Sequence, residues 1–308
     1  MTKTNLQEHE GSFAGIWTAL LTPFSADRSI DWAAFERLIA VQLEAKICGL
    51  VLSGTTGEGS TLRVQEKISL LRKAKALVGG RLRVMAGVGG SSTPEVIELA
   101  RLSQEAGADS LLVVTPPYNK PNDQGMIEHF AAIAESVTIP LCLYHNPGRT
   151  AQQLSAKLMA RICQHPRISV IKDSSGDLCL FSAYKQQHLA ALLSGEDLTY
   201  LPSLAVGGVG CISVIANIFP REMRLLGEWW LAGDSKRALA MHEALFPLMQ
   251  ALFWETNPCP LKAAAAELGL CNNIVRLPLA PLNAELHAKL KQVLAETKTR
   301  LADEGFYA

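Results

Sequence analysis

Short apolar segments alternate with longer amphipathic segments eight times along this chain, and this alternation limits the possible folds more than any other feature. The short segments are rich in β-branched residues and the longer ones are compatible with helices, a combination typical of parallel βαβ units. Between two of them, Thr93 is predicted to cap a helix with Pro94 in its first position, and Gly107 to end it. The predicted strands are Gly15–Leu21, Gly49–Ser53, Arg83–Gly87, Ser110–Thr115, Pro140–His145, Ser169–Lys172, Ala191–Ser194 and Gly210–Val214.

Eight consecutive βα units favour a closed (β/α)8 TIM barrel over an open sheet. A doubly wound sheet usually stops at fewer strands and carries a nucleotide-binding fingerprint, which this sequence does not contain. From about Asp234 the pattern is helical to the end, over 235–253, 260–268 and 283–301. We therefore predict an α/β fold with a (β/α)8 barrel catalytic domain over 12–232. A C-terminal helical appendage over 233–308 is predicted to pack on it.

The composition excludes several classes of partner. Hydrophobic residues make up 48% of the 308 residues, enough for a large core and unlike a disordered chain. The 29 basic and 29 acidic side chains cancel, so no net charge attracts nucleic acid or anionic lipid. We expect a small-molecule partner, with no nucleic acid and no membrane.

The cysteines and the uncharged segments indicate a cytoplasmic protein. Seven scattered cysteines without a Cys-x-x-Cys pair match neither a disulfide framework nor a structural zinc site. The polar segment 1–11 has no apolar core of a signal peptide. The longest uncharged stretch, 201–219, is broken by Pro202 and three glycines, so we predict no transmembrane segment.

The predicted sixth strand ends in a lysine, Lys172. Active sites of barrels lie at the carboxyl-terminal ends of the strands, so Lys172 is predicted at the site. A lysine amine with an ordinary pKa of ~10.4 becomes a nucleophile near neutral pH only where its surroundings lower that pKa to ~7–8. The free amine would attack a ketone and form a Schiff base. A lysine that extends into solvent or pairs with an acid is the alternative.

The predicted fifth strand ends in Tyr144, and Arg149 follows on the next loop. The phenol of Tyr144 could relay protons, and the guanidinium of Arg149 has the planar shape that binds a carboxylate. A core tyrosine and a solvated arginine are the alternatives. Because neighbouring strand residues point to opposite faces, we expect His145 to pack outside the barrel or cap a loop.

Two further loops follow predicted strands. Gly54–Ser60 is glycine-rich and its backbone N–H groups could hold a carboxylate, but Ser60 replaces the lysine of a triphosphate-binding loop. The loop 115–121 presents Tyr118 between prolines, although a plain turn is the alternative. The seven histidines show no metal-ligand spacing, so we predict metal-independent chemistry.

These motifs together resemble one family. They are Gly54-Thr-Thr-Gly-Glu58, Thr115-Pro-Pro-Tyr118-Asn-Lys-Pro121, Tyr144 with Pro147-Gly-Arg149-Thr150, Ile171-Lys172-Asp-Ser-Ser-Gly176, Leu193-Ser-Gly195-Glu-Asp197 and Asn257-Pro-Cys-Pro260-Leu-Lys262. In order and spacing the chain resembles the dihydrodipicolinate synthase and N-acetylneuraminate lyase family of class I pyruvate aldolases, which are lyases on a barrel with C-terminal helices.

The resemblance implies a role for each site residue. Lys172 would form a Schiff base with pyruvate, with no other cofactor. Thr55, Tyr144 and Tyr118 of the partner subunit would form a proton relay. Thr56 and the backbone near Ile212 would bind the carboxylate of pyruvate, and Gly195 would form the floor of the cavity. Arg149 would bind the carboxylate of the second substrate.

The resemblance also implies a reaction and an assembly. The favoured reaction condenses pyruvate with L-aspartate 4-semialdehyde to 4-hydroxy-tetrahydrodipicolinate, in lysine and diaminopimelate biosynthesis. A pyruvate-forming aldolase or dehydratase of a 2-keto-3-deoxy acid is the alternative, and a non-catalytic barrel that binds 2-oxo acids is a second. A tyrosine from a partner subunit implies at least a dimer, commonly a dimer of dimers. At the positions of the family's lysine-inhibition pocket this chain has Val64, Lys67, Ser91 and Pro117, so we do not expect feedback inhibition by lysine.

Overall fold

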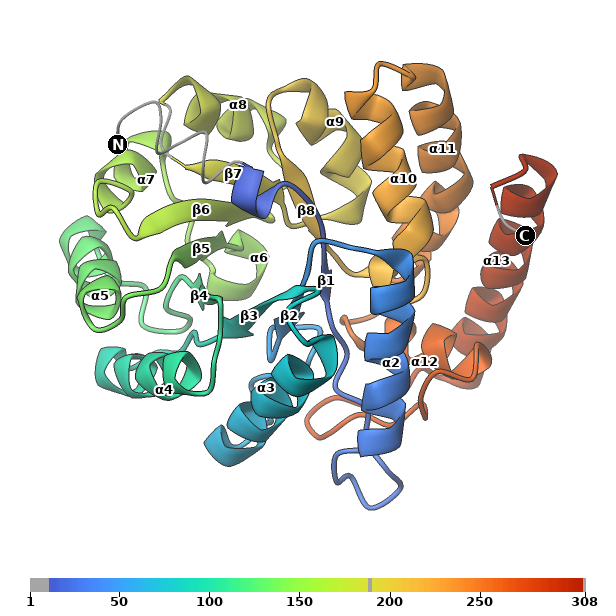
Figure 1. Ribbon diagram of the computed structural model, residues 1–308, viewed down its shortest axis with the longest axis horizontal. Helices are drawn as coiled ribbons and strands as arrows, with labels where there is room; N and C mark the ends of the chain where they lie inside the picture. The colour runs from blue at the N-terminus through green and yellow to red at the C-terminus, as the bar shows by residue number, and fades with distance from the viewer. Residues whose placement is uncertain (1–10, 188–189, 307–308) are drawn as a thin grey trace.

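The computed structural model describes residues 11–187 and 190–306, and it confirms the predicted barrel. The strands are all parallel, and each is hydrogen-bonded to the next in chain order until β8 closes on β1 (Figure 1). They are β1 (Gly15–Ala19), β2 (Gly49–Leu52), β3 (Arg83–Gly87), β4 (Ser110–Val114), β5 (Leu141–His145), β6 (Ile168–Asp173), β7 (Ala191–Ser194) and β8 (Gly210–Ser213). Each predicted strand is present, with ends that differ by at most two residues.

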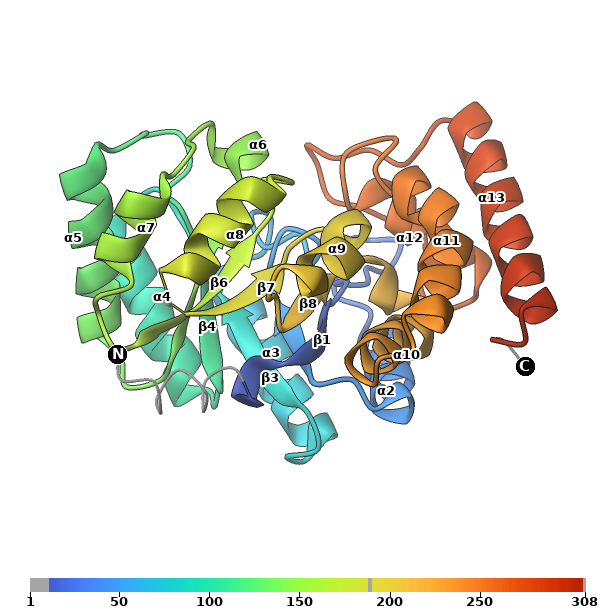
Figure 2. The same cartoon turned by 90° about the horizontal axis from the view of Figure 1, so that it is seen from above.

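Helices cover the outside of this barrel (Figure 2). Their apolar faces pack on the outward-facing strand residues, as a layered α/β fold requires. Around the barrel they are α2 (Trp32–Ala45), α3 (Val64–Val78), α4 (Thr93–Glu105), α5 (Asp123–Glu135), α6 (Pro147–Thr150), α7 (Ala156–Ile162), α8 (Leu178–Gln186), α9 (Tyr200–Ala205) and α10 (Pro220–Leu231), with short 3-10 turns η1 (Asp197–Thr199) and η2 (Ile215–Asn217).

The predicted cap of α4 is wrong by one residue. Ser92 is the N-cap, so Thr93 and Pro94 are the first two helical residues. The Thr93 hydroxyl bonds Nδ1 of His129 on the neighbouring helix at 2.8 Å instead of capping its own helix. The predicted end of α4 is confirmed, since Gly107 follows the last turn with φ of +94°. Glycine adopts this left-handed conformation without strain.

The core has two layers because strand side chains alternate between the two faces of the sheet. On β5 and β6, Cys142, Tyr144 and Val170 belong to the cluster inside the barrel. Leu143 and Ile171 belong to the larger cluster between the strands and the helices. Successive strand residues therefore point in turn into the barrel and toward the helices, so only every second residue at a strand end can face a site inside the barrel.

Three further helices extend the fold at the C-terminus: α11 (Ser235–Ala251), α12 (Cys259–Glu267) and α13 (Ala284–Asp303). Helix α11 packs on α10, and α13 packs on both α11 and α12 as the outermost helix (Figures 1 and 2). The boundary predicted between residues 232 and 233 falls in the turn between α10 and α11. The division into two domains stays a prediction.

A buried ion pair joins α12 to the glycine-rich loop after β2. Lys262 and Glu58 are both fully buried as side chains, and the ammonium of Lys262 donates to Glu58 Oε1. The other carboxylate oxygen of Glu58 accepts the backbone N–H of Arg276 at 2.9 Å, and Nζ of Lys262 also donates to the Ile274 carbonyl at 2.7 Å. These bonds fasten the C-terminal helices to the loop that precedes α3.

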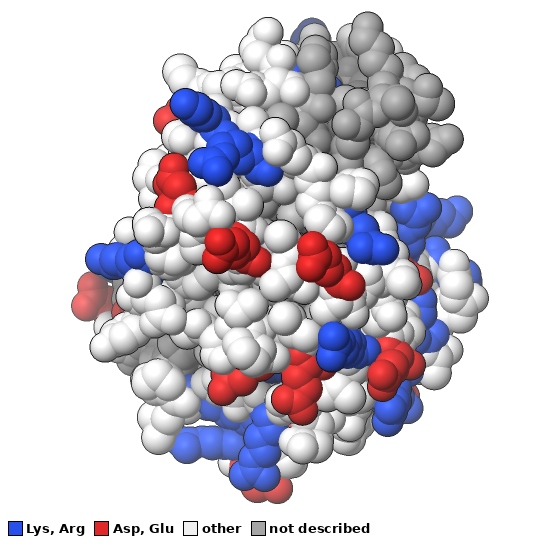
Figure 3. All heavy atoms as spheres, turned by 90° about the vertical axis from the view of Figure 1, so that its left-hand side faces the viewer, with Lys and Arg blue, Asp and Glu red and all other residues white. Residues whose placement is uncertain are grey.

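The surface mixes charges of both signs. On the face in Figure 3, which is the side that carries α5, basic and acidic side chains are interspersed. Within residues 11–187 and 190–306, no helix has both the length and the apolar character needed to cross a bilayer. The same residues contain no cluster of three or more His, Cys, Asp or Glu side chains placed to hold a metal ion.

Candidate active site

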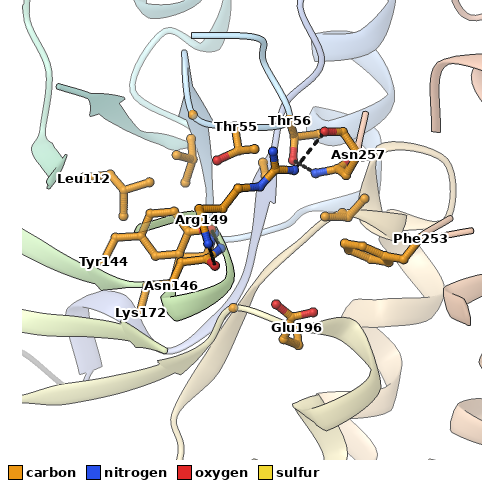
Figure 4. Close-up of a pocket in the computed structure, with 15 residues that line it drawn as sticks. Thr55, Thr56, Leu112, Tyr144, Asn146, Arg149, Lys172, Glu196, Phe253 and Asn257 are labelled. Atoms are coloured by element: carbon orange, nitrogen blue, oxygen red, sulfur yellow. Dashed lines mark hydrogen bonds between the residues drawn. The ribbon is translucent and has the colours of Figure 1, made fainter. Parts of the chain in front are cut away.

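A pocket lies where the strands end, between the barrel and the C-terminal helices (Figure 4). Its polar lining comes from the loop after β2, from β5 and β6, from the segment after β7, and from the segment between α11 and α12. Side chains from distant parts of the sequence therefore converge here, at the end of the barrel where active sites of this fold are found.

Lys172 and Tyr144 form the centre of this pocket. They are direct register partners on the adjacent strands β6 and β5. Lys172 is only 6% exposed, and its Nζ lies 3.9 Å from the centroid of the Tyr144 ring. The amine is thus shielded from bulk water and held against an aromatic face, as the prediction for this pair required.

The surroundings of the Tyr144 phenol lower its pKa. Its burial by itself raises its pKa, but the charge of Lys172 and hydrogen bonds from Asn146 and Ser174 outweigh this, so the pKa lies below its usual value. The Asn146 amide donates to the Tyr144 hydroxyl at 2.7 Å. A phenol with a lowered pKa gives up its proton more readily, which suits a relay.

The loop after β2 brings Thr55 and Thr56 to the pocket, as predicted. The loop folds tightly on itself, and a β-carbon at Gly59 would lie 2.0 Å from the Ser53 carbonyl oxygen, so only glycine fits there. Thr56 is almost fully buried, and its hydroxyl accepts a hydrogen bond of 3.0 Å from the amide of Asn257.

Arg149 reaches the pocket from the short helix α6. The Asn146 side chain caps this helix by accepting the backbone N–H of Arg149 at 3.1 Å. The Arg149 guanidinium crosses toward Asn257 and donates to its carbonyl at 3.2 Å (Figure 4). Among the residues that the structure describes, the other N–H groups of this guanidinium have no hydrogen-bond partner.

Gly195 forms part of the pocket wall behind the lysine. A β-carbon at this position would lie 2.0 Å from Oγ of Ser174 and 2.9 Å from both the Asp173 carbonyl oxygen and Cε of Lys172, so a larger residue does not fit without shifts of these neighbours. The Gly195 N–H donates to the Asp173 carbonyl at 2.6 Å, which holds the end of β7 against β6.

Two predicted site residues are not part of the pocket lining. Ile212 is fully buried in the cluster inside the barrel, and it is Val214, two residues further along the chain, that borders the pocket. Tyr118 is 91% exposed, has a φ of +70° and lies outside the pocket of its own chain.

Sequence reasoning missed Glu196 and Asn257 as site residues. Glu196 lies across the pocket from Arg149 (Figure 4), and Asn257 contacts both Thr56 and Arg149. Both residues belong to motifs that resembled the family. Glu196 stands two residues after the seventh predicted strand, a signal that could have found it, whereas Asn257 follows no strand. Burial raises the pKa of Glu196 to about 7, with the Asp197 carboxylate adding to the rise and the Lys172 charge opposing it.

Replacing Glu196 by glutamine is expected to stabilise the protein in mildly alkaline solution. The pKa of the Glu196 carboxyl group is about 7 in the folded protein, whereas its ordinary value, taken for the unfolded chain, is 4.5. The folded state therefore binds this proton more tightly than the unfolded state does. The stabilisation is complete below the unfolded pKa and is lost as pH rises through about 7. Glutamine does not titrate, so Glu196→Gln avoids this loss. Relative to the wild type, its free energy of unfolding should be higher by up to about 3 kcal/mol at about pH 8 and almost unchanged at about pH 4.

Urea unfolding of the wild type and of Glu196→Gln across this pH range measures the difference. Glu285→Gln is the matched control, because its carboxylate is exposed on α13 and should give no such trend. A stability difference that does not vary with pH contradicts the assignment.

The site and the fold together define a class: barrel proteins that hold a buried lysine beside a tyrosine at the carboxyl ends of the strands. The model of the Dihydrodipicolinate synthetase family matches residues 12–297. The chain belongs to this family.

Similar proteins cover nearly the whole chain. The 4-hydroxy-tetrahydrodipicolinate synthase of Magnetococcus marinus is 40% identical over 289 residues, which is 92% of this chain and 98% of that protein. The solved structure of the 4-hydroxy-tetrahydrodipicolinate synthase of Methylacidiphilum fumariolicum SolV has a TM-score of 0.93 at 39% identity, over 96% and 100% of the two chains. The chloride-inhibited dihydrodipicolinate synthase of Acinetobacter baumannii, solved in complex with pyruvate, has a TM-score of 0.90 at 37% identity, over 92% and 98%.

Proposed function

We propose that this protein condenses pyruvate with L-aspartate 4-semialdehyde to form 4-hydroxy-tetrahydrodipicolinate. The observation that carries the proposal is the buried amine of Lys172, held 3.9 Å from the Tyr144 ring in a pocket that also contains Arg149. The names of the similar proteins support this reaction, and the structure of one of them was solved in complex with pyruvate. The chemistry needs a Schiff base on the chain itself and no added cofactor.

In the first half of the proposed reaction, the neutral amine of Lys172 attacks the keto carbon of pyruvate. The carbinolamine oxygen leaves as water after protonation, and a carbon–nitrogen double bond forms. The methyl carbon then loses a proton to give an enamine. Tyr144 gives and takes the protons of these steps, with the Thr55 hydroxyl on the same side of the pocket.

In the second half, the enamine carbon bonds to the aldehyde carbon of the acceptor, and the aldehyde oxygen takes a proton to become a hydroxyl. The amino group of the acceptor then attacks the imine carbon. This attack closes the ring. A proton passes from the ring nitrogen to the nitrogen of Lys172, and the bond from the ring carbon to Lys172 breaks as a carbon–nitrogen double bond forms in the ring, so that the lysine returns as a free amine.

The far side of the pocket suits an amino acid acceptor. Arg149 offers a guanidinium for the acceptor carboxylate, and the Glu196 carboxylate faces it across the pocket (Figure 4). The Asn257 side-chain oxygen is buried and has no hydrogen-bond partner among the residues that the structure describes. Glu196 and Asn257 would thus accept hydrogen bonds from the acceptor's ammonium group.

Replacing Arg149 by alanine is expected to weaken acceptor binding while leaving pyruvate binding intact. Loss of a charge-assisted pair of about 2–3 kcal/mol corresponds to a rise of roughly 30- to 150-fold in the acceptor KM. Steady-state kinetics with each substrate varied in turn measures this. An unchanged acceptor KM contradicts the role, and Arg161→Ala, on the outer helix α7, is the control.

We also propose that the protein works as a homo-oligomer, with Tyr118 of the partner subunit completing the proton relay. Two observations support this: Tyr118 is 91% exposed, and it is not among the residues that line the pocket of its own chain. Tyr118→Phe and Lys172→Ala proteins should each be nearly inactive alone, yet regain activity when unfolded and refolded together, because mixed dimers contain one intact site. Absence of any regain, with oligomers shown by sedimentation, contradicts the shared site.

A substrate screen tests the reaction itself. Purified protein is incubated with pyruvate and L-aspartate 4-semialdehyde, and in parallel with 2-keto-3-deoxy acids, and consumption of each is followed. Turnover of the deoxy acids without loss of the semialdehyde would assign the protein to the degradative aldolases. Borohydride reduction with pyruvate that leaves the intact mass unchanged would exclude both enzymes.

We also propose a cytoplasmic location, which the seven free cysteines support.

A further inference from the structure

A histidine and an aspartate lie directly behind the two central residues of the site, on the outer face of the barrel. His145 follows Tyr144 on β5, and Asp173 follows Lys172 on β6. The register that pairs Tyr144 with Lys172 also pairs His145 with Asp173. Because side chains alternate along a strand, the first pair points into the pocket and the second toward the helices.

The histidine is held by hydrogen bonds on both ring nitrogens. Nδ1 lies 2.9 Å from Oδ2 of Asp173, and Nε2 accepts the backbone N–H of Leu154 at 3.1 Å. Since Nε2 is an acceptor, the ring proton is on Nδ1 and is donated to the carboxylate. The other oxygen of Asp173 accepts from the backbone N–H and the hydroxyl of Ser175, at 2.9 and 2.6 Å. The Tyr184 hydroxyl of α8 lies 3.4 Å from Nδ1.

This arrangement is unusual for its surroundings. The His145 and Asp173 side chains are 0% and 2% exposed, and the outward pair before them is apolar, Leu143 against Ile171. A buried polar pair generally stabilises a fold no more than apolar side chains of the same volume would. Its place at the ends of the two strands that carry Tyr144 and Lys172 points to a role in the geometry of the site.

The same two residues also hold the neighbouring backbone. The His145 carbonyl accepts the N–H of Ser174 at 2.8 Å, and the Asp173 carbonyl accepts the N–H of Gly195 at 2.6 Å. Any shift of one residue against the other therefore moves Lys172 relative to both Tyr144 and the wall behind it. A displacement of about 1 Å of a catalytic group can lower the rate about a hundredfold.

We propose that His145 and Asp173 are positioning residues whose mutual hydrogen bond sets the placement of Lys172 against Tyr144. The inference rests on the proposed function, since it concerns the lysine that would form the Schiff base. Neither residue touches the substrate. Their effect passes through the two strand ends and through Leu154, Ser175 and Tyr184, which keep the pair in one orientation.

The test is a double-mutant cycle in which the side chain at position 145 is shortened and the side chain at position 173 is lengthened. Asparagine is shorter than histidine and glutamate is longer than aspartate, so His145→Asn and Asp173→Glu should each disturb the contact, while the double variant can restore it. We expect each single variant to lower kcat and the rate of borohydride trapping of pyruvate about 10- to 100-fold. The pyruvate KM should change less than about threefold, and the double variant should regain about tenfold.

Two controls separate positioning from simple destabilisation. Ile171→Val alters the outward residue of β6 two positions before Asp173 and should leave kcat unchanged. Nitrogen-15 NMR of the wild type, with the His145 ring assigned by through-bond correlation to its own backbone, should show Nδ1 protonated and Nε2 unprotonated. The opposite tautomer would overturn the proposal even if the single variants do not fold.

The outcomes also distinguish this inference from the proposed function. A wild type that traps no pyruvate at Lys172 contradicts the proposed function. A wild type that traps pyruvate, with single variants that trap it equally fast, or a double variant no better than the worse single variant, overturns the positioning role alone.

Discussion

Replacing Lys172 by alanine is expected to abolish both covalent capture of pyruvate and turnover. The variant lacks the amine that attacks the keto carbon. Tyr144, whose ring lies against this amine, carries a phenol and cannot form a Schiff base in its place. Removal of a covalent nucleophile lowers kcat on the order of 10⁴-fold or more in other enzymes. Borohydride reduction in the presence of pyruvate, followed by intact mass, should add one reduced pyruvyl group to the wild type and none to Lys172→Ala.

Tyr144→Phe is the matched control for this result. It removes only the hydroxyl, so the amine of Lys172 stays buried against an aromatic ring and the adduct should still form. Turnover should fall about 10²- to 10⁴-fold, the usual contribution of a proton-transfer group. A pyruvyl group found on Lys172→Ala, or full turnover by Tyr144→Phe, would contradict the roles assigned to these two residues.

Replacing Glu58 by glutamine is expected to cause the largest loss of stability. The substitution leaves the ammonium of Lys262 fully buried with its charge partner removed, and burial already lowers the pKa of this lysine although Glu58 opposes the shift. Breaking a buried pair in this way costs about 3–5 kcal/mol. The free energy of unfolding is measured from the midpoint and slope of a denaturant titration. We also expect the loop that carries Thr55 and Thr56 to become more mobile in this variant.

The double variant Glu58→Gln with Lys262→Met tests the cause. It removes both charges, and methionine keeps most of the apolar contact with the Phe24 ring, above which Nζ lies at 4.0 Å. We expect it to recover most of the lost stability. Glu36→Gln breaks the partly exposed pair with Lys73 and should cost at most about 1 kcal/mol. A single Glu58 variant as stable as the Glu36 variant would contradict the argument.

Local patterns were sufficient to predict the barrel and its central residues. Strand segments are short and apolar, and a barrel places whatever follows them at one end. Strand ends made Lys172, Tyr144 and Arg149 candidates for one pocket while leaving their alternatives open, and the resemblance favoured the site. The structure brings all three to the pocket. The expectation that His145 packs outside the barrel is confirmed as well, because it depends only on the alternation of strand side chains.

Long-range partners could not be predicted in this way. Asn257 meets Thr56 across 201 residues, and Lys262 meets Glu58 across 204. Nothing in a polar turn or in an alanine-rich helix indicates which distant loop it contacts. Glu196 has an ordinary acidic side chain in the sequence, and its raised pKa arises from burial that exists only in the folded protein.

The eight-stranded architecture and the lysine at the end of β6 follow from the amino-acid pattern, because periodicity and strand order are local properties that survive closure into a barrel. Three features are visible only in the folded chain: Glu196 and Asn257 complete the pocket, a buried ion pair attaches α12 to the loop beside it, and His145 meets Asp173 behind Lys172. These features depend on register, burial and contacts between distant segments, which arise only when the chain closes on itself.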